Sequence, residues 1–217
     1  MSDNLPIPQL YFILDLARSG DPLSEIEAAL QVTPIVSLLI KDTPQTDITQ
    51  DLVKALQAHN IAVLLEDSDK VRALMADGVH LNTDEPCDFE QVKQRLDDND
   101  IIGVSSQSSR HGAMTIAEQG ASYIAIEATG SNTNDENEQQ IMDENQLAPT
   151  IDWWVALFET PCVAWNIETI EAALTAQQMG ADFLALAPTY WQRGQNTFDV
   201  IQELQTALTE NAIEQNN

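Results

Sequence analysis

Carboxylate, ammonium and hydroxyl groups follow short apolar runs of the sequence, at the points where those runs end. In chain order these residues are Lys41, Asp67, Asp84, Glu85, Ser105 and Ser106. Carboxylate oxygens can hold a divalent cation together with a few waters, and lysine and serine can donate to an anionic ligand. Each type also has an ordinary role, because a lysine at a strand end is usually solvated and a serine there can cap the next helix. The elements that carry these residues decide whether they meet at one site.

The net charge disfavours some classes of partner. The 217 residues contain 9 Lys and Arg against 35 Asp and Glu, which gives a formal charge of −26. A chain this acidic, without a basic stripe, would repel the phosphates of nucleic acid, and an anionic membrane surface is disfavoured for the same reason. The imbalance is strongest after residue 110, where Arg193 is the one base beside 16 acids. No run approaches the roughly 18 apolar residues that a membrane-spanning helix needs.

The N-terminal residues and the cysteines indicate a location. We expect a cytoplasmic protein, because Met-Ser-Asp-Asn-Leu-Pro lacks a basic and then apolar signal pattern. The 2 cysteines are too few for a disulfide framework and have no metal-ligand spacing. We expect both thiols to be reduced, with Cys162 in the core and Cys87 near a loop.

Short runs rich in β-branched or aromatic residues recur along the chain and predict strands. Between them lie segments with helical spacing that open on turn or capping residues. The runs are continuously apolar, which is typical of parallel strands buried on both faces. Eight such units favour a closed (β/α)₈ TIM barrel over an open sheet, and the length suits a single domain over residues 1–217. The predicted strands are 10–14, 34–40, 61–65, 78–81, 101–104, 122–126, 161–165 and 182–187.

Three segments that precede predicted strands echo one another. They read Ala76-Asp77-Gly78, Gly120-Ala121-Ser122 and Gly180-Ala181-Asp182. In each segment a helix is expected to end and a strand to begin almost at once, which supports a chain of repeated units. The helix starts expected from capping residues and proline are Asp21-Pro22, Glu85-Pro86 and Asn166.

A polar segment interrupts this spacing after the sixth predicted strand. Residues 131–149 contain five acids, no base and many Asn and Gln, so they are too polar to pack. We expect a long acidic loop here, on the face of the barrel where active sites are built. Two roles stay open for it, a solvated insertion or a functional lid.

Four motifs occur in an order and spacing that resemble a known superfamily. They are Leu10-Tyr11-Phe12-Ile13-Leu14-Asp15, Ala76–Leu81 (ADGVHL), Ile101–Ser105 (IIGVS) and Gly180-Ala181-Asp182. Together they resemble the thiamine phosphate synthase and thiazole tautomerase superfamily over nearly the whole chain, and ADGVHL followed by IIGVS is the specific part. The resemblance implies a TIM barrel. It also implies the synthase reaction of that family, in which hydroxymethylpyrimidine pyrophosphate is coupled with thiazole phosphate in the presence of Mg²⁺.

The resemblance implies roles for the residues at the ends of the runs. Asp67 matches the family's Mg²⁺ aspartate, and Asp84 and Glu85 keep carboxylates where the family has a second acidic motif. Mg²⁺ is therefore the cofactor that the resemblance implies, with these three acids as candidate ligands. The candidates for substrate or phosphate contacts, matched after the second and fifth strands, are Lys41, Ser105 and Ser106.

Several positions depart from the family's pattern. Leu39 replaces an arginine, and residues 127–135 contain no lysine where the family has one. The family's Ile-Gly-Gly-Ile becomes Ala164-Trp165-Asn166-Ile167, so Trp165 would fill the space that a phosphate needs. The tautomerase histidine is replaced by Ala128. These losses argue against efficient synthase turnover and against tautomerase activity.

Aromatic residues gather near the ends of the last predicted strands. They are Trp153, Trp154, Trp165, Tyr190 and Trp191. A barrel mouth lined by such side chains would suit an uncharged ring or a protein segment better than a diphosphate. For Trp153 and Trp154 the alternative is the amphipathic start of a helix, and for His80 within ADGVHL we expect an inward packing role.

Three functions stay open after the sequence analysis. The first is a divergent, Mg²⁺-dependent transferase of thiamine biosynthesis, a diverged paralogue of the synthases. The second is a non-catalytic ligand-binding or regulatory homologue that takes a thiamine intermediate. The third is an interaction protein, in which the acidic loop and the aromatic mouth contact a basic protein partner. The sequence leaves the oligomeric state open.

Overall fold

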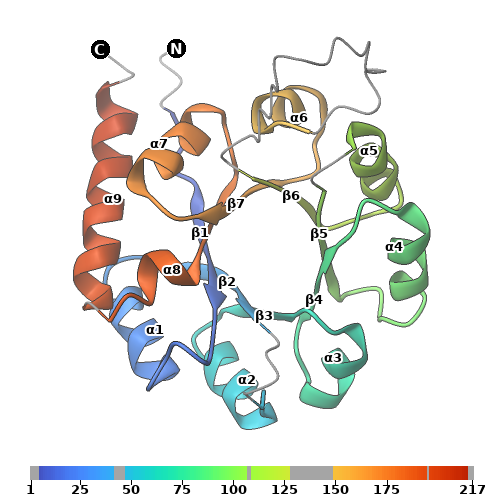
Figure 1. The fold of residues 1–217 in the computed structure, drawn as a ribbon, viewed down its shortest axis with the longest axis horizontal. Helices are drawn as coiled ribbons and strands as arrows, with labels where there is room; N and C mark the ends of the chain where they lie inside the picture. The colour runs from blue at the N-terminus through green and yellow to red at the C-terminus, as the bar shows by residue number, and fades with distance from the viewer. Residues whose placement is uncertain (1–4, 42–46, 107–108, 128–148, 195, 215–217) are drawn as a thin grey trace, which may run out of the picture.

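The computed structural model describes residues 5–41, 47–106, 109–127, 149–194 and 196–214. Its eight strands are parallel and close into one barrel in chain order, with β8 returning to pair with β1. Figure 1 looks into the ring of strands and shows the helices around its outside. The predicted (β/α)₈ TIM barrel is confirmed. The strands are β1 (Gln9–Leu14), β2 (Ile35–Ile40), β3 (Ala62–Leu65), β4 (Gly78–Asn82), β5 (Ile101–Ser105), β6 (Tyr123–Glu127), β7 (Cys162–Ile167) and β8 (Phe183–Leu186).

Helices alternate with the strands and cover the outer face of the barrel (Figure 1). The four-residue α8 lies in the connection that follows β8, so the long α9 completes the eighth unit and packs against α1 and α7. The helices are α1 (Pro22–Leu30), α2 (Gln50–Gln57), α3 (Ser68–Leu74), α4 (Pro86–Lys93), α5 (Arg110–Glu118), α6 (Ile151–Leu157), α7 (Ile170–Gln178), α8 (Pro188–Trp191) and α9 (Thr197–Glu214).

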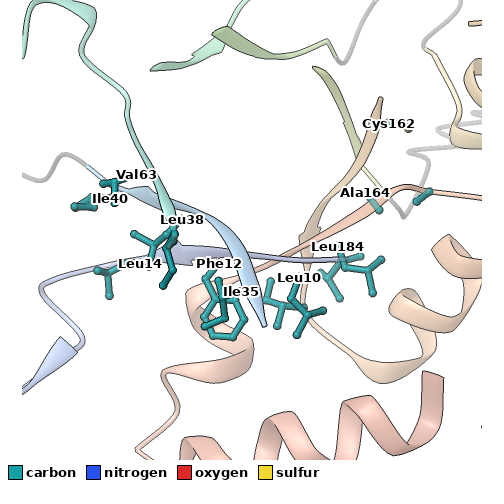
Figure 2. Packing of buried hydrophobic residues seen from close by; sticks show 14 of the residues in the cluster. Leu10, Phe12, Leu14, Ile35, Leu38, Ile40, Val63, Cys162, Ala164 and Leu184 are labelled. Atoms are coloured by element: carbon teal, nitrogen blue, oxygen red, sulfur yellow. The ribbon is translucent and has the colours of Figure 1, made fainter. Parts of the chain in front are cut away.

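The barrel has two cores, because successive side chains of a strand point to opposite faces. The outer core lies between strands and helices, and Figure 2 shows Leu10, Phe12 and Leu14 of β1 beside Leu38 of β2 in it. Cys162 is also buried there, as predicted. The inner core fills the barrel and is the one that positions the candidate site. Its buried members are Tyr11, Ile13, Leu39, Leu64, Tyr123, Ala125, Val163 and Ala185.

Two of the predicted helix starts are confirmed. The carboxylate of Asp21 caps α1 by accepting a hydrogen bond from the backbone N–H of Ser24 at 3.3 Å, and Pro22 occupies the first turn. Glu85 precedes α4 and Pro86 is its first residue. Proline suits this position because the first N–H of a helix has no partner within the helix.

The helix start predicted at Asn166 is wrong. β7 continues to Ile167, and Thr169 caps α7 instead, its hydroxyl accepting from the Ala172 N–H at 3.1 Å. Asn166 has a φ of 58°, whereas a residue that caps a helix N-terminus has an extended backbone. The left-handed Asn166 accompanies a register shift of β7 against β8 between Ala164 and Ile167.

The three echoed segments share one hydrogen-bonding role at the N-terminal ends of the strands. In each segment one polar residue, Asp77, Ser122 or Asp182, accepts a hydrogen bond with its side chain from a backbone N–H of the strand before it. The backbone N–H of that polar residue donates in return to the carbonyl of the same strand residue. The pairs and their side-chain distances are Asp77 with Val63 at 2.7 Å, Ser122 with Ile102 at 3.0 Å and Asp182 with Cys162 at 2.8 Å. The return bonds measure 2.8, 2.8 and 3.0 Å. The echo therefore links neighbouring units of the barrel in pairs.

Two sequence expectations bear on the remaining parts of the chain. Among the described residues no helix is long and apolar enough to cross a membrane. The predicted acidic loop, residues 131–149, lies outside the described residues except for Pro149. Cys87 is exposed on α4, as expected for a residue near a loop.

Candidate functional site

His80, on β4, is the centre of a buried polar network inside the barrel. Its Nδ1 lies 2.8 Å from the hydroxyl oxygen of Tyr123, and its Nε2 lies 2.9 Å from Oγ of Ser105. The side chain is 5% exposed, and this burial lowers the pKa of His80 to about 3. The imidazole is therefore neutral at physiological pH. The predicted inward position of His80 is confirmed.

Tyr123 and Tyr11 extend the network across the barrel from β6 to β1. Their hydroxyl oxygens lie 3.0 Å apart, and their rings meet edge to face with centroids 5.9 Å apart. Burial raises the pKa of both hydroxyls well above the ordinary tyrosine value. Gly103 on β5 makes room for the Tyr123 ring, since a Cβ there would lie 1.8 Å from Tyr123 Cζ. The network is thus uncharged and depends on a missing side chain.

Trp165, on β7, stacks over this network. Its ring lies parallel to the His80 imidazole, with centroids 4.0 Å apart and planes at 5°. It also meets the Tyr11 ring edge-on, with centroids 5.6 Å apart. The next residue is the left-handed Asn166, and asparagine tolerates this conformation better than most residues that carry a Cβ. The stacked Trp165 and the left-handed Asn166 are therefore neighbours near the end of β7.

The structure gives internal partners to two of the three predicted phosphate contacts. Ser105 bonds to His80, and Ser106 Oγ donates to Asp84 Oδ1 at 2.6 Å. Both serines are buried. Lys41 directly follows β2 and is half-buried, with its backbone N–H donating to the Leu14 carbonyl at 2.9 Å. Lys41 thus lies beside the end of β1, and both serines lie at the carboxyl end of β5.

The three predicted Mg²⁺ ligands follow β3 and β4. Asp67 caps α3 by accepting from the backbone N–H two residues on at 2.9 Å, and its carboxylate lies 3.9 Å from Nζ of Lys70. Asp84 accepts the hydrogen bond from Ser106. Glu85 is exposed and makes no side-chain cap bond to α4. Within the described parts of the chain, no three His, Cys, Asp or Glu side chains lie close enough together to hold a metal ion.

The aromatic mouth predicted from the sequence is reduced to Trp165. Tyr190 and Trp191 are buried in the outer core, where the Trp191 Nε1–H donates to the Ile13 carbonyl at 3.0 Å. They turn outward because residues 188–191 form α8. Trp154 is also buried in the outer core, so the alternative interpretation, an amphipathic α6, is confirmed for it.

The two tyrosines of the network were not predicted from the sequence as site residues. Tyr11 and Tyr123 alternate with outward residues of β1 and β6, so the two-residue period of a strand could have placed them on the inner face. The period does not predict that the two tyrosines contact each other, because that contact depends on which strands face each other across the barrel. The glycine at 103, opposite Tyr123 in the strand register, was the available signal.

Known proteins with similar sequences settle the family. The chain matches the thiamine monophosphate synthase family over residues 10–186. It is 32% identical to the thiamine-phosphate synthase of Erythrobacter litoralis, over 84% of this chain and 88% of that protein. This chain belongs to the thiamine monophosphate synthase family. It is also 32% identical to the thiamine-phosphate synthase of Rhodospirillum centenum, over 72% of this chain and 74% of that one.

Solved structures support the fold of this family member. Thiamine phosphate pyrophosphorylase from Pyrococcus furiosus superposes with a TM-score of 0.69 at 18% identity, covering 95% of this chain and 98% of that one. Orotidine 5′-phosphate decarboxylase from Pyrococcus horikoshii gives a TM-score of 0.63 at 14% identity, covering 93% and 99%. At such identities the likeness shows a shared barrel and no shared chemistry.

The Mg²⁺ implied by the family resemblance finds no preformed site among these carboxylates. One oxygen of Asp67 is held by the N-terminus of α3, and Asp84 is held by the Ser106 hydroxyl at 2.6 Å. Each of these carboxylates accepts a hydrogen bond at one of its two oxygens. Among the described residues the acids are therefore not gathered into a ready-made metal site, and Mg²⁺ bound here would take further oxygens from waters or from a ligand.

Proposed function

We propose that this member of the thiamine monophosphate synthase family binds an uncharged heteroaromatic intermediate of thiamine biosynthesis at the barrel mouth, with little or no synthase turnover. The observation that supports the proposal is the stack of Trp165 on the neutral His80, with centroids 4.0 Å apart. Aromatic faces of this kind attract another ring by stacking and burial of apolar area. The protein would act as a ligand-binding or regulatory homologue.

Charges around the carboxyl ends of the strands also favour an uncharged ligand. Glu66 follows β3, Asp84 follows β4, and Glu127 ends β6 opposite Trp165 in the strand register. A diphosphate among these carboxylates would be repelled at short range. Lys41 after β2 opposes this repulsion, whereas Arg18 is paired with Asp15 and Arg193 lies over the ring of Tyr190. The balance of charge therefore disfavours a phosphorylated ligand.

A comparison of ligands with and without phosphate tests this proposal. Isothermal titration calorimetry should show hydroxymethylpyrimidine or the thiazole alcohol binding more tightly than its phosphate ester, because the ester adds charge beside the carboxylates. Trp165→Ala should weaken binding by roughly 10-fold, as expected when a stacking partner is lost. Tighter binding of the ester, or unchanged binding by Trp165→Ala, would refute the proposal.

Trp153→Ala is the matched control. Trp153 is half-buried on α6, where the Arg110 guanidinium lies 4.6 Å from its ring centroid. The substitution removes an indole of the same size without touching the stack on His80. Ligand affinity should stay within about 2-fold of the unmodified protein, since the ring contacts of Trp153 are with Trp154, Phe158 and Arg110 and not with the stack on His80.

A second candidate is the Mg²⁺-dependent synthase reaction, which family membership favours. Lys41, Ser105 and Ser106 would then contact phosphate oxygens, and the ligands of Mg²⁺ would come from Asp67, Asp84 and Glu85. Thiamine phosphate should form from hydroxymethylpyrimidine pyrophosphate and thiazole phosphate, stop on chelation of Mg²⁺, and fall by roughly 10- to 100-fold in Asp67→Asn. No product above an enzyme-free blank at high enzyme concentration would exclude this candidate.

A further inference from the structure

The side chains of β7 depart from strict alternation near the carboxyl end of the strand. Val163 lies in the inner core and Ala164 in the outer core, as the two-residue period of a strand requires. Trp165 packs against the inner core again. The same period would place Ile167 inside the barrel, yet Ile167 is fully buried in the outer core. One residue between Trp165 and Ile167 therefore falls outside the alternation.

Asn166 is that extra residue. Between the paired positions Ala164 and Ile167, β7 has two residues where β8 has one. This is a β-bulge, in which an extra residue bends a strand and re-aims a side chain. Asn166 has a φ of 58°, a left-handed value that asparagine adopts more readily than most residues with a Cβ. The bulge is therefore centred on Asn166.

The residues on both sides of the bulge are held in place. Ala164 and Ile167 are fully buried, and the Ile167 carbonyl accepts a hydrogen bond from the Ala187 N–H at 2.9 Å. Because Ile167 is fixed on the outer face, a regular strand with the same number of residues would place residue 165 on the outer face as well. The indole would then lie among the helices, away from His80.

We infer that Asn166 is a positioning residue, whose left-handed backbone turns Trp165 into the barrel and so forms the stack on His80 to which a ligand ring would add. The two rings lie with centroids 4.0 Å apart and planes at 5°. Trp165 is half-buried, so part of the indole stays accessible. The effect on a ligand rests on the proposed function, whereas the orientation of Trp165 does not.

The positioning role belongs to the backbone of Asn166 and not to its amide group. The side chain is exposed, and the bulge requires only a left-handed φ. Glycine adopts such a φ without steric cost, whereas a β-branched residue is poorly suited to it. Asn166→Gly should therefore keep the stack of Trp165 on His80, and Asn166→Val should lose it.

Nuclear magnetic resonance of the full chain measures the stack. The face of an indole shields the protons of a ring stacked on it, so the carbon-bound imidazole protons of His80 should move downfield in Trp165→Ala. The chain has three histidines, and the signals missing from the His80→Gln spectrum assign His80. Asn166→Val should move the His80 signals toward their positions in Trp165→Ala, and Asn166→Gly should leave them near their original positions. Unmoved His80 signals in folded Asn166→Val would overturn the inference.

Asn60→Val is the matched control. Asn60 is exposed before β3, at the N-terminal ends of the strands, and has a φ of 61°, so valine meets a similar backbone strain there. The two valine variants should lose similar urea midpoints, but only Asn166→Val should move the His80 signals. Equal displacement of these signals in both variants would overturn the positioning role. Asn166→Ala, with a smaller side chain, serves in the same test if Asn166→Val does not fold.

Calorimetry with hydroxymethylpyrimidine separates this inference from the proposed function. Asn166→Val should weaken binding by roughly 10-fold, as loss of a stacking partner does, while Asn166→Gly and Asn60→Val should stay within about 2-fold of the unmodified protein. Unchanged affinity in Asn166→Val would overturn the effect of Asn166 on the ligand. Absence of binding by the unmodified protein would refute the proposed function, and the His80 signals would still decide whether Asn166 orients Trp165.

Discussion

His80 is neutral because of its place in the barrel. It is 5% exposed, lies under the ring of Trp165 and meets hydroxyls at both nitrogens. A charged imidazole would lose its hydration here without gaining an anion. Ser105, the next residue in the network, is hydrogen-bonded to this neutral ring. The chemistry around His80 is therefore hydrogen bonding and stacking between uncharged groups.

Replacing His80 with glutamine should flatten the pH dependence of stability on the acidic side. The pKa of His80 is lowered to about 3 in the folded protein and lies near 6.5 in an unfolded chain. Between these values the unfolded state binds a proton that the folded state does not. The free energy of unfolding therefore falls as pH falls, by up to about 1.4 kcal/mol per pH unit.

Urea unfolding from about pH 7 to about pH 4.5 measures this effect. The carboxylates titrate in both proteins, so the difference between the two slopes isolates His80. His111→Gln is the control, because His111 is exposed at the start of α5. Parallel pH profiles for the unmodified protein and His80→Gln would contradict the buried neutral histidine.

Gly103→Ala should damage the network through the ring of Tyr123. A Cβ at residue 103 would lie 1.8 Å from Cζ of Tyr123, so the ring must shift and its bond to His80 is lost. Overpacking of this kind costs about 1–3 kcal/mol of unfolding free energy. Gly20→Ala is the control, since a Cβ there meets nothing within 4 Å. Equal urea midpoints for the two variants would contradict the packing of Tyr123 against Gly103.

At the scale of elements, the barrel could be predicted because its signals are local. Most strand residues belong to short apolar runs, and Asp21-Pro22 marks a helix start from neighbouring residues alone. The site could not be predicted in this way. The partners of His80 lie 25 and 43 residues away in sequence, and their meeting depends on strand register. Asp67 shows the same limit, because the cap that its carboxylate makes to α3 depends on where that helix begins, while its role as a metal ligand stays a prediction.

Asp182→Ala should destabilise the barrel at the N-terminal ends of its strands. The Asp182 carboxylate accepts from the Cys162 N–H at 2.8 Å, and its backbone bonds β7 and β1. Loss of the carboxylate deprives the buried Cys162 N–H of this acceptor, at a cost of about 1–3 kcal/mol. Asp182→Asn keeps an acceptor and should lose less. Asp98→Ala removes an exposed carboxylate and is the control for the loss of charge. Equal losses of unfolding free energy in Asp98→Ala and Asp182→Ala, measured by chemical unfolding, would contradict the role of the Asp182 carboxylate as acceptor for the Cys162 N–H.

At the scale of the whole molecule, the negative charge is distributed unevenly. The ion pairs found among the described residues, such as Arg72 with Asp97 and Arg95 with Asp69, join residues before position 110. In the later part of the chain, Arg193 lies over the ring of Tyr190, 4.8 Å from its centroid. Its acids, including Glu203 and Glu210 on α9, therefore repel one another with little compensation. This repulsion opposes folding and also opposes anionic ligands.

Screening of that repulsion should stabilise the protein. Raising NaCl from about 0.01 to about 1 M shortens the Debye length from about 30 to about 3 Å, so the urea midpoint should rise. Glu203→Lys with Glu210→Lys changes the net charge by +4, from −26 to −22, and should raise the midpoint at low salt while reducing its salt dependence. General salt effects on apolar burial are shared by both proteins, so they cancel in the comparison. A urea midpoint that falls with salt, or an equal salt dependence in both proteins, would contradict a destabilising repulsion among the acids after residue 110.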